Sequence, residues 1–231
     1  MASFVLIPGA WHGGWCWKRL APLLREAGHA VYPITLTGLG ERAHLAQADT
    51  GLETHVRDVV SVLEWEELCD AVVVGHSYAG MVAAGVAGRA PARIKHVVIL
   101  DGFLPADGQS LADLKGAEFL DRCRDRAERA GCAWLVPPPE DATFDLKDPR
   151  DIAWLRAKLT PHPLRSFAEP VRIEHPLAEG DFGRTFLQCW LPGQPHWKAP
   201  QNSFRRVEIE AGHDAMVDAP ELLARTLLGL L

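Results

Sequence analysis

Ser77 stands in a sequence context that can turn a serine hydroxyl into a nucleophile. An apolar run over residues 71–74 leads directly into residues 75–79 (GHSYA), and a stretch of small residues follows. A strand that turns sharply into a helix at a Gly-x-Ser-x-Gly sequence exposes its serine at the edge of a sheet. Ala79 departs from the last glycine of that motif, but it is also small, and Gly80 follows it. A serine that only caps a helix is the alternative, although capping does not require small residues on both sides.

His213 is the histidine best placed to accept a proton from such a serine. A serine hydroxyl is a poor nucleophile without a neighbouring base, and His213 follows the last strand-like run on a loop opened by Gly212. The weaker candidates are His12, His76 and His96, since His76 is adjacent to the serine and should diverge from it, and His96 begins a strand-like run. A solvated loop histidine without a chemical role is the other interpretation of His213.

Two backbone N–H groups are needed to stabilise the oxyanion that forms when a serine attacks a carbonyl. One donor is expected from Tyr78, the residue after the serine, and the other from the loop after the first strand. That loop reads PGAWHGGW over residues 8–15, so we expect Ala10 to be the second donor, with Trp11 as the alternative. A plain glycine turn is the competing interpretation of this loop.

An acidic side chain should orient His213 and stabilise its protonated form. The segment after the penultimate strand-like run, residues 192–206 (PGQPHWKAPQNSFRR), contains no Asp or Glu. Asp101 is our candidate, because it ends the strand that follows the proposed nucleophile and should lie at the same edge of the sheet. Asp107 lies further into the loop, and Asp214 would have to fold back on its neighbour, so we rank them second and last. A carboxylate that only caps a turn is the alternative.

These residues are positioned by apolar, strand-like runs that alternate with amphipathic, helical runs. Nearly all-apolar strands alternating with helices predict an α/β fold with a mostly parallel sheet and helices on both faces. A chain of 231 residues that is 48% hydrophobic suits one globular domain over residues 1–231. The strand-like runs are SFVLIPG, AVYPI, DAVVVG, IKHVVILD, RTFLQCWL and RRVEIE, and the helical runs include WKRLAPLLREAG, LETHVRDVVSVLEWEE, YAGMVAAGVAGRA and APELLARTLLGLL.

An inserted helical cap is expected over about residues 106–182. The alternation fails there, and charged helical runs such as LKGAEFLDRCRDRAERAG are broken by proline-containing segments such as VPPPED. The insertion follows the fourth strand, so the cap and the sheet should enclose a cleft over the strand ends. Trp11 and His12 from the first loop, with Trp134 and Trp154 from the cap, are our candidates for binding a substrate with a flat aromatic group. We find no obvious Arg or Lys clamp and expect this ester-like substrate to be uncharged.

Charge and composition argue against several other classes of protein. The formal net charge is -6, and Lys and Arg are spread among Asp and Glu, so no basic stripe suggests nucleic-acid binding. No cationic leader or run of about 18 apolar residues indicates a membrane segment, so we expect a cytoplasmic protein that binds a small molecule. The five cysteines are scattered without a Cys-x-x-Cys pair, so we expect neither disulfides nor a metal site, and no cofactor.

A dinucleotide-binding loop is the alternative suggested by GLGERA at residues 38–43. The segment fits Gly-x-Gly-x-x-Ala, but a dinucleotide-binding turn follows the first strand and opens a helix directly. Here the segment follows the second strand, and residues 42–51 intervene before the next helical run. We therefore do not expect a nucleotide cofactor.

With these residues in place, the chain resembles the α/β-hydrolase superfamily, and within it the small hydrolases related to plant methylesterases and hydroxynitrile lyases. The resemblance is carried by FVLIPGAWHGGWCWKRLAPLLREAGHAV, LTGLGE, VVVGHSYAGMV and GHDAM. It implies an acyl-enzyme mechanism, in which Ser77 attacks an ester, amide or carbamate carbonyl, His213 accepts and returns the proton, and water completes the cycle. The resemblance extends to bacterial enzymes that hydrolyse carbamates and aryl esters.

The chain departs from this family's pattern in the first loop and after the histidine. Members usually carry His-Gly after the first strand, whereas Pro8 precedes Gly9 here. The hydroxynitrile lyases use a threonine in this loop and a lysine after the catalytic histidine, and this chain has Gly9 and Asp214 at those places. Cyanide release is therefore disfavoured. A lyase that cleaves a C–C bond and a non-catalytic ligand-binding protein on the same fold are the alternatives to a hydrolase.

Overall fold

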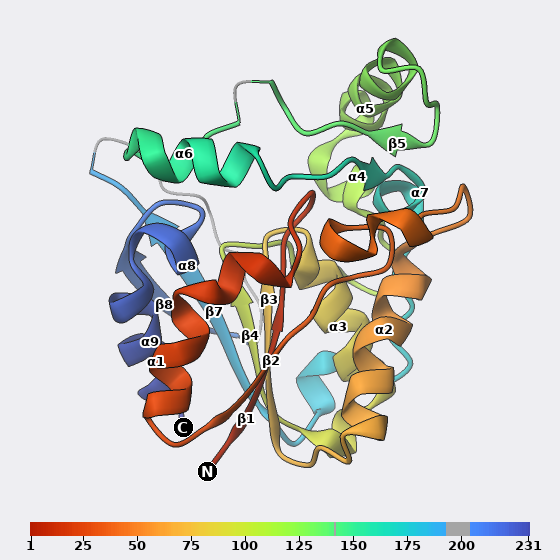
Figure 1. Ribbon diagram of the computed structural model, residues 1–231. Coiled ribbons are helices and arrows are strands. Elements are labelled where there is room, and N and C mark those ends of the chain that lie inside the picture. The colour runs from red at the N-terminus through yellow and green to blue at the C-terminus, as the bar shows by residue number, and fades with distance from the viewer. Residues whose placement is uncertain (141, 193–203) are drawn as a thin grey trace.

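The computed structural model describes residues 1–140, 142–192 and 204–231, which fold around a six-stranded sheet (Figure 1). The strands lie in the order β2-β1-β3-β4-β7-β8, and every neighbouring pair is parallel. The predicted α/β class with a parallel sheet is confirmed. The strands are β1 Ser3–Ile7, β2 Ala30–Pro33, β3 Ala71–His76, β4 Ile94–Leu100, β7 Gly183–Trp190 and β8 Arg205–Glu210.

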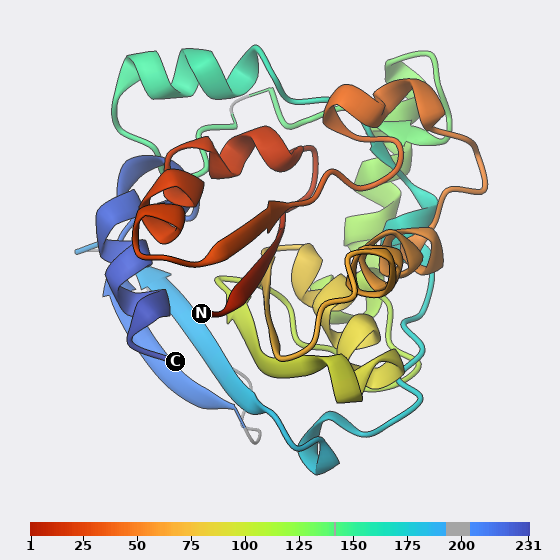
Figure 2. The same cartoon turned by 60° about the horizontal axis from the view of Figure 1, so that its bottom comes forward.

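Helices cover both faces of the sheet (Figure 2). On one face, α1 (Leu20–Glu26) and α9 (Pro220–Leu228) pack against each other. On the other face, α2 (Leu52–Trp65) packs against α3 (Ala79–Arg89). No face of the central strands is left to water, which is why their sequences are almost wholly apolar.

Alternate residues of each central strand enter the two opposite cores, as the pleat of a strand requires. Val5 and Ile7 of β1 belong to the core beneath α2 and α3, whereas Phe4 and Leu6 belong to the core beneath α1 and α9. The sheet is thereby fixed between two apolar layers. Its strand ends are the part of the sheet that is free to carry polar chemistry.

The cap, residues 106–182, lies over the carboxyl-terminal ends of the strands (Figure 1). It contains a short antiparallel pair, β5 and β6, that is separate from the main sheet. Each of these strands has two residues, so the sequence carries no alternation from which to predict them. The cap elements are α4 Leu111–Lys115, α5 Ala117–Arg129, β5 Leu135–Val136, α6 Pro149–Arg156, β6 His162–Pro163, α7 Arg165–Ala168 and η4 Leu177–Glu179.

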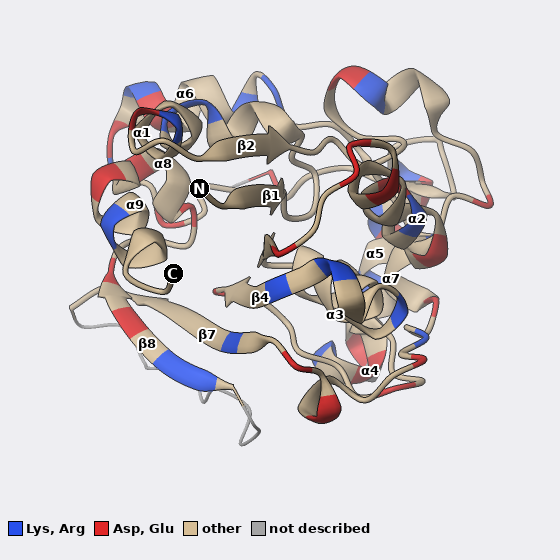
Figure 3. Ribbon diagram, turned by 90° about the horizontal axis from the view of Figure 1, so that it is seen from below, with Lys and Arg blue, Asp and Glu red and all other residues tan. Residues whose placement is uncertain are grey.

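The other elements are η1 Gly14–Lys18, η2 Gly40–Leu45, η3 Pro91–Arg93 and α8 Ala215–Asp218. The GLGERA segment runs into the 3-10 turn η2 rather than into α2, so it lacks the strand-turn-helix geometry of a dinucleotide site. Acidic and basic residues are interspersed along the ribbon (Figure 3). Within the described ranges, no helix is long and apolar enough to cross a membrane.

Candidate active site

Ser77 occupies the sharp turn between β3 and α3. Its φ of 53° lies in the left-handed region, which costs a residue with a side chain about 1–2 kcal/mol. The turn is tied to the neighbouring strand, because the Ser77 N–H donates to Leu100 O at 3.0 Å and Ser77 O accepts from the Phe103 N–H at 3.2 Å. A strained serine held between a strand and a helix is the geometry that exposes a hydroxyl at the sheet edge.

Two glycines beside this turn leave no room for a side chain. A Cβ on Gly75 would lie 2.4 Å from Ala79 O, and a Cβ on Gly80 would lie 2.1 Å from Phe103 O. Both neighbouring atoms belong to the backbone and cannot swing aside. Ala79 itself is accommodated in the buried interior, so the close approach that requires a glycine falls one position later than the motif suggests.

His213 and Asp101 form a short side-chain hydrogen bond. His213 Nδ1 lies 2.6 Å from Asp101 Oδ2, which leaves Nε2 as the ring nitrogen that can accept a proton. Asp101 follows β4 with a φ of 43°, and its Oδ1 accepts from the Cys189 N–H at 3.2 Å. Burial lowers the pKa of His213, but the hydrogen bond and charge of Asp101, with the charges of Asp214 and Asp145, outweigh burial and raise this pKa above its ordinary value.

The other two carboxylates considered for this position are engaged elsewhere. Asp107 Oδ1 accepts a hydrogen bond from the Ile173 N–H at 2.8 Å on an exposed loop. Asp214 is fully buried, and its Oδ2 lies 3.0 Å from His12 Nε2. Of the three candidates, Asp101 is the one that is hydrogen-bonded to the His213 ring.

His12 and Asp214 form a buried pair that sequence reasoning missed. His12 Nδ1 lies 2.7 Å from Ala10 O, so this ring bonds the oxyanion loop with one nitrogen and Asp214 with the other. Burial raises the pKa of Asp214, but the charges of His12, His76 and His213 and the hydrogen bond from His12 bring it below its ordinary value. The expectation that His12 contacts substrate is corrected, because its ring is only 1% exposed and joins two loops behind the cavity.

His76 holds the loop that carries His213. His76 Nε2 lies 2.9 Å from His213 O and donates to it, so the ring bonds the His213 backbone rather than Ser77. Burial, assisted by the charge of His213, lowers the pKa of His76 well below its ordinary value, and the ring is therefore neutral. This orientation agrees with the divergence expected of adjacent residues in the turn.

One cluster of possible metal ligands adjoins the site. His76, His213 and Asp214 each present a ligand atom, and these atoms lie within 4.8 Å of one another. His76 Nε2 already donates to His213 O, and Asp214 is already paired with His12. A metal ion would have to displace both interactions, so we assign no metal to this cluster.

Ala10 and Tyr78 supply the two backbone amides that fit an oxyanion site. Both residues line the same cavity, and in the described part of the chain neither N–H donates a hydrogen bond. The alternative donor, Trp11, is already engaged, because its N–H donates to His162 Nδ1 at 3.2 Å. The two free amides follow β1 and β3, which are neighbours in the sheet.

A cavity of about 340 Å³ lies between the strand ends and the cap. Ser77, Asp101 and His213 all line it, so the three polar side chains predicted to act together face one enclosed space. Its other walls are mainly aromatic and aliphatic, which suits a substrate with an apolar, planar group. The lining also includes Ala10, Trp11, Tyr78, Phe103, Leu111, Lys115, Phe119, Phe144, Asp145, Phe167, Cys189, Trp190 and Ala211.

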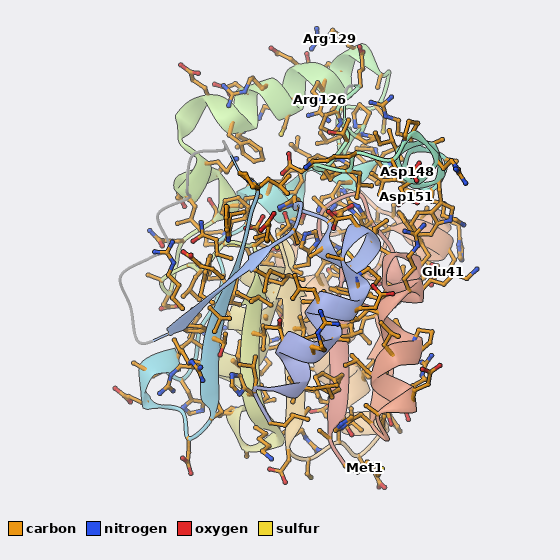
Figure 4. The ribbon with its side chains drawn as sticks, turned by 90° about the vertical axis from the view of Figure 1, so that its left-hand side faces the viewer. Met1, Glu41, Arg126, Arg129, Asp148 and Asp151 are labelled. Carbon is orange, nitrogen blue, oxygen red and sulfur yellow. The ribbon has the colours of Figure 1, made fainter. Side chains whose placement is uncertain are left out.

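The expected roles of Trp134 and Trp154 in substrate binding are corrected, because neither residue lines this cavity. Trp154 of α6 packs edge-on against Trp15, with ring centroids 5.1 Å apart, and Arg19 lies over the Trp154 ring at 5.7 Å. Arg19 also pairs with Asp151 of the same helix, which Figure 4 labels. These contacts fasten α6 to the body of the protein instead of shaping the site.

Lys115 is a cation in the cavity wall that sequence reasoning also missed. Its Nζ lies 5.4 Å from the centroid of the Phe103 ring and 5.8 Å from that of Phe119. Lys115 ends α4, and the orientation of this short helix is set by a capping box between Ser110 and Asp113. The expectation that no Lys lies near the site is therefore wrong.

The sheet order and a strained serine at a strand-helix turn beneath a cap define an α/β hydrolase. The model of the alpha/beta hydrolase family matches residues 4–226, and the chain belongs to this family. A solved extracellular alpha/beta-hydrolase from a Paenibacillus species, described as sharing homology with tobacco salicylic acid binding protein 2, superposes with a TM-score of 0.86 at 25% identity. That match covers 100% of this chain and 99% of the other.

Similar curated proteins refine this class. A carbendazim hydrolyzing esterase from Nocardioides sp. (strain SG-4G) is 38% identical over 100% of both chains. Methylesterase 9 of Arabidopsis thaliana is 35% identical over 46% of this chain and 41% of its own. An alpha-hydroxynitrile lyase of the same plant is 36% identical over 44% of this chain and 40% of its own. The predicted kinship with methylesterases and hydroxynitrile lyases is confirmed, and the protein is a hydrolase of the esterase type.

Proposed function

We propose that the protein is a serine hydrolase that cleaves an aryl ester or carbamate through an acyl-enzyme intermediate. The observation that carries this proposal is the 2.6 Å hydrogen bond between His213 and Asp101, in a cavity that Ser77 also lines. A histidine whose Nδ1–H is held by a carboxylate presents Nε2 as a base, which is what a serine nucleophile requires.

Each group then has one role in the reaction. His213 Nε2 takes the hydroxyl proton as Ser77 Oγ attacks the carbonyl carbon, and the Ala10 and Tyr78 N–H groups stabilise the resulting oxyanion. The intermediate collapses when its bond to the leaving oxygen or nitrogen breaks and His213 returns the proton to that atom. Water attacks the acyl-enzyme by the same route, which releases the acid and restores Ser77.

The aromatic walls of the cavity support a planar aromatic group on the substrate. The relative that is similar over its whole length is named for hydrolysis of carbendazim, a carbamate with a flat heteroaromatic ring. Phe119, Phe144 and Phe167 line the cavity and offer surfaces on which such a ring can stack. A lyase reaction is disfavoured, since the position after His213 carries the buried Asp214 and no cation.

The proposal is tested with purified wild type, Ser77→Ala and His213→Ala against p-nitrophenyl acetate and carbendazim. We expect each variant to lose at least about 10⁴-fold in kcat, because such residues act as a unit. A serine-reactive fluorophosphonate should label the wild type on Ser77. Ser61→Ala, which changes an exposed serine of α2, is the control and should label and turn over normally. A wild type that neither hydrolyses these substrates nor labels would refute the serine mechanism.

A further inference from the structure

Trp11, in the loop that carries the proposed oxyanion donor Ala10, has an unfavourable backbone conformation. Its φ is 67°, in the left-handed region that bulky side chains rarely adopt. Such a conformation persists only where the surroundings impose it. The contacts that hold Trp11 therefore identify what shapes the oxyanion loop.

Every polar group of Trp11 is bound by the cap. The N–H donates to His162 Nδ1 at 3.2 Å, the carbonyl oxygen accepts from the Thr160 N–H at 3.1 Å, and Nε1 donates to Val136 O at 3.0 Å. Arg126, labelled in the cap in Figure 4, lies over the indole ring at 5.6 Å. The oxyanion loop is thus held in place by the inserted segment as well as by the sheet from which it leaves.

The hydrogen-bond network fixes which nitrogen of His162 carries hydrogen. The Ser166 hydroxyl donates to Pro163 O at 2.8 Å, so its oxygen must accept from His162 Nε2, which lies 2.7 Å away. Nε2 therefore carries the hydrogen, and Nδ1 keeps the lone pair that accepts the Trp11 N–H. The ring is fully buried, and burial, with the charges of His55 and His12, lowers the pKa of His162 well below its ordinary value.

We propose that His162 is a positioning residue for the oxyanion hole, because its Nδ1 accepts the Trp11 N–H and so holds the Ala10 N–H toward the reacting carbonyl. This inference rests on the proposed serine hydrolase function. Without the bond, the peptide between Ala10 and Trp11 is free to rotate out of its strained geometry. His162 does not line the cavity, so it acts on the substrate only through this loop.

The second oxyanion donor is packed against the same histidine. The Tyr78 ring meets the His162 ring edge-on, with centroids 4.8 Å apart, while Phe167 stacks on the other ring system of this group at 4.4 Å and 5°. The Tyr78 hydroxyl is anchored separately, 2.8 Å from His55 Nδ1. One cap residue therefore contacts both residues whose amides face the oxyanion, and its bond to Trp11 is the polar part of that contact.

The test compares His162→Asn, whose Oδ1 can replace Nδ1 as the acceptor, with His162→Leu, which offers none. We measure kcat and KM for p-nitrophenyl acetate and the melting temperature of each variant. Loss of one oxyanion donor costs about 10²–10³-fold in kcat, so a displaced loop should cost His162→Leu about 10- to 100-fold. We expect KM to change less than about threefold, because the aromatic walls are untouched, and we expect His162→Asn to recover most of the lost kcat.

Equal kcat values for folded His162→Asn and His162→Leu would overturn the inference, since a packing role does not depend on an acceptor. If His162→Leu does not fold, Ser166→Ala carries the test, because it removes the group that keeps hydrogen on Nε2. A fall of about tenfold in its kcat with KM unchanged supports the positioning role, and an unchanged kcat overturns it. A wild type without hydrolysis or fluorophosphonate labelling would instead defeat the proposed function, which separates the two failures.

Discussion

His213 Nδ1 lies 2.6 Å from Asp101 Oδ2 although the two residues are 112 positions apart. They follow β8 and β4, which flank β7 in the sheet, so the carboxylate reaches the histidine across the end of the intervening strand. Parallel strands bring all their carboxyl ends to one edge. The acid can therefore sit after β4 even though the segment after β7 contains no Asp or Glu.

Asp101→Asn should lower kcat about 10³–10⁴-fold, because an amide no longer holds His213 in the required tautomer or stabilises its charged form. It should also move the pH profile. His213 must be unprotonated to act as a base, and Asp101 helps to raise its pKa above the ordinary 6.5, so wild-type kcat/KM should rise with pH around a midpoint above 6.5. Removing the carboxylate lowers that pKa, and the midpoint should fall. The measurement is kcat/KM for an uncharged aryl ester from pH 5 to 9.

Asp107→Asn is the matched control for this variant, because Asp107 bonds the Ile173 backbone on an exposed loop. Its rate and its pH midpoint should stay close to those of the wild type. If the Asp107 variant were the crippled one, or if both variants kept the wild-type midpoint, the assignment of Asp101 would be wrong.

Gly80→Ala should destabilise the protein by about 3 kcal/mol or more, because the new Cβ would lie 2.1 Å from the Phe103 carbonyl oxygen and the backbone must shift. Ala79→Gly restores the full Gly-x-Ser-x-Gly motif and should cost about 1 kcal/mol of helix stability while leaving kcat within a few fold. Urea unfolding of both variants checks the contrast. Comparable stabilities for the two would mean that the close approach at Gly80 does not restrain the turn.

The sequence predicted the parts of the site that depend on local order along the chain. Ser77 and His213 each follow an apolar strand-like run, and a parallel sheet brings the ends of such runs together. Asp101 was reached because the segment after the penultimate strand contains no acid, combined with the position of Asp101 at a strand end. Each of these inferences needed only the strand pattern.

The remaining parts of the site depend on how distant segments pack. His12 and Asp214 are 202 residues apart on two loops, and nothing in either loop alone indicates the pair. Trp154 was expected in the cavity but packs on Trp15, and Lys115 was overlooked but lines it. The direction in which a cap helix faces is set by tertiary contacts, and its own periodicity does not reveal which face meets the substrate.

Asp214→Asn should lower the free energy of unfolding at neutral pH by about 3–5 kcal/mol, because it leaves the buried His12 ring without its carboxylate. The pKa of Asp214 in the folded state lies below its ordinary 3.8, so its ionisation stabilises the fold above that pH and this contribution is lost on acidification. The difference between wild type and variant should therefore shrink below about pH 4. Urea unfolding at pH 7 and at pH 3.5 measures both values.

Asp218→Asn is the control of opposite sign, because burial raises the pKa of Asp218 despite its hydrogen bond from the Gly212 N–H. Ionisation of Asp218 opposes folding as pH rises through its folded pKa. Replacement by Asn should consequently cost less at pH 7 than at pH 3.5, relative to wild type. A difference that grows on acidification for Asp214→Asn would contradict the buried ion pair.

Lys115→Met should change selectivity between substrates of different charge more than it changes the reaction itself. The Lys115 ammonium is exposed at the cavity wall, where an ion pair contributes about 0.2–1 kcal/mol, so an anionic substrate should lose up to about fivefold in kcat/KM. Phenyl acetate and 4-carboxyphenyl acetate form a matched pair that differs in one carboxylate. Their kcat/KM ratio should fall in Lys115→Met, whereas it should stay constant in Lys158→Met, which changes a lysine over Trp15 outside the cavity. An unchanged ratio in both variants would show that Lys115 does not meet the leaving group and that the cavity selects substrates by their aromatic surface alone.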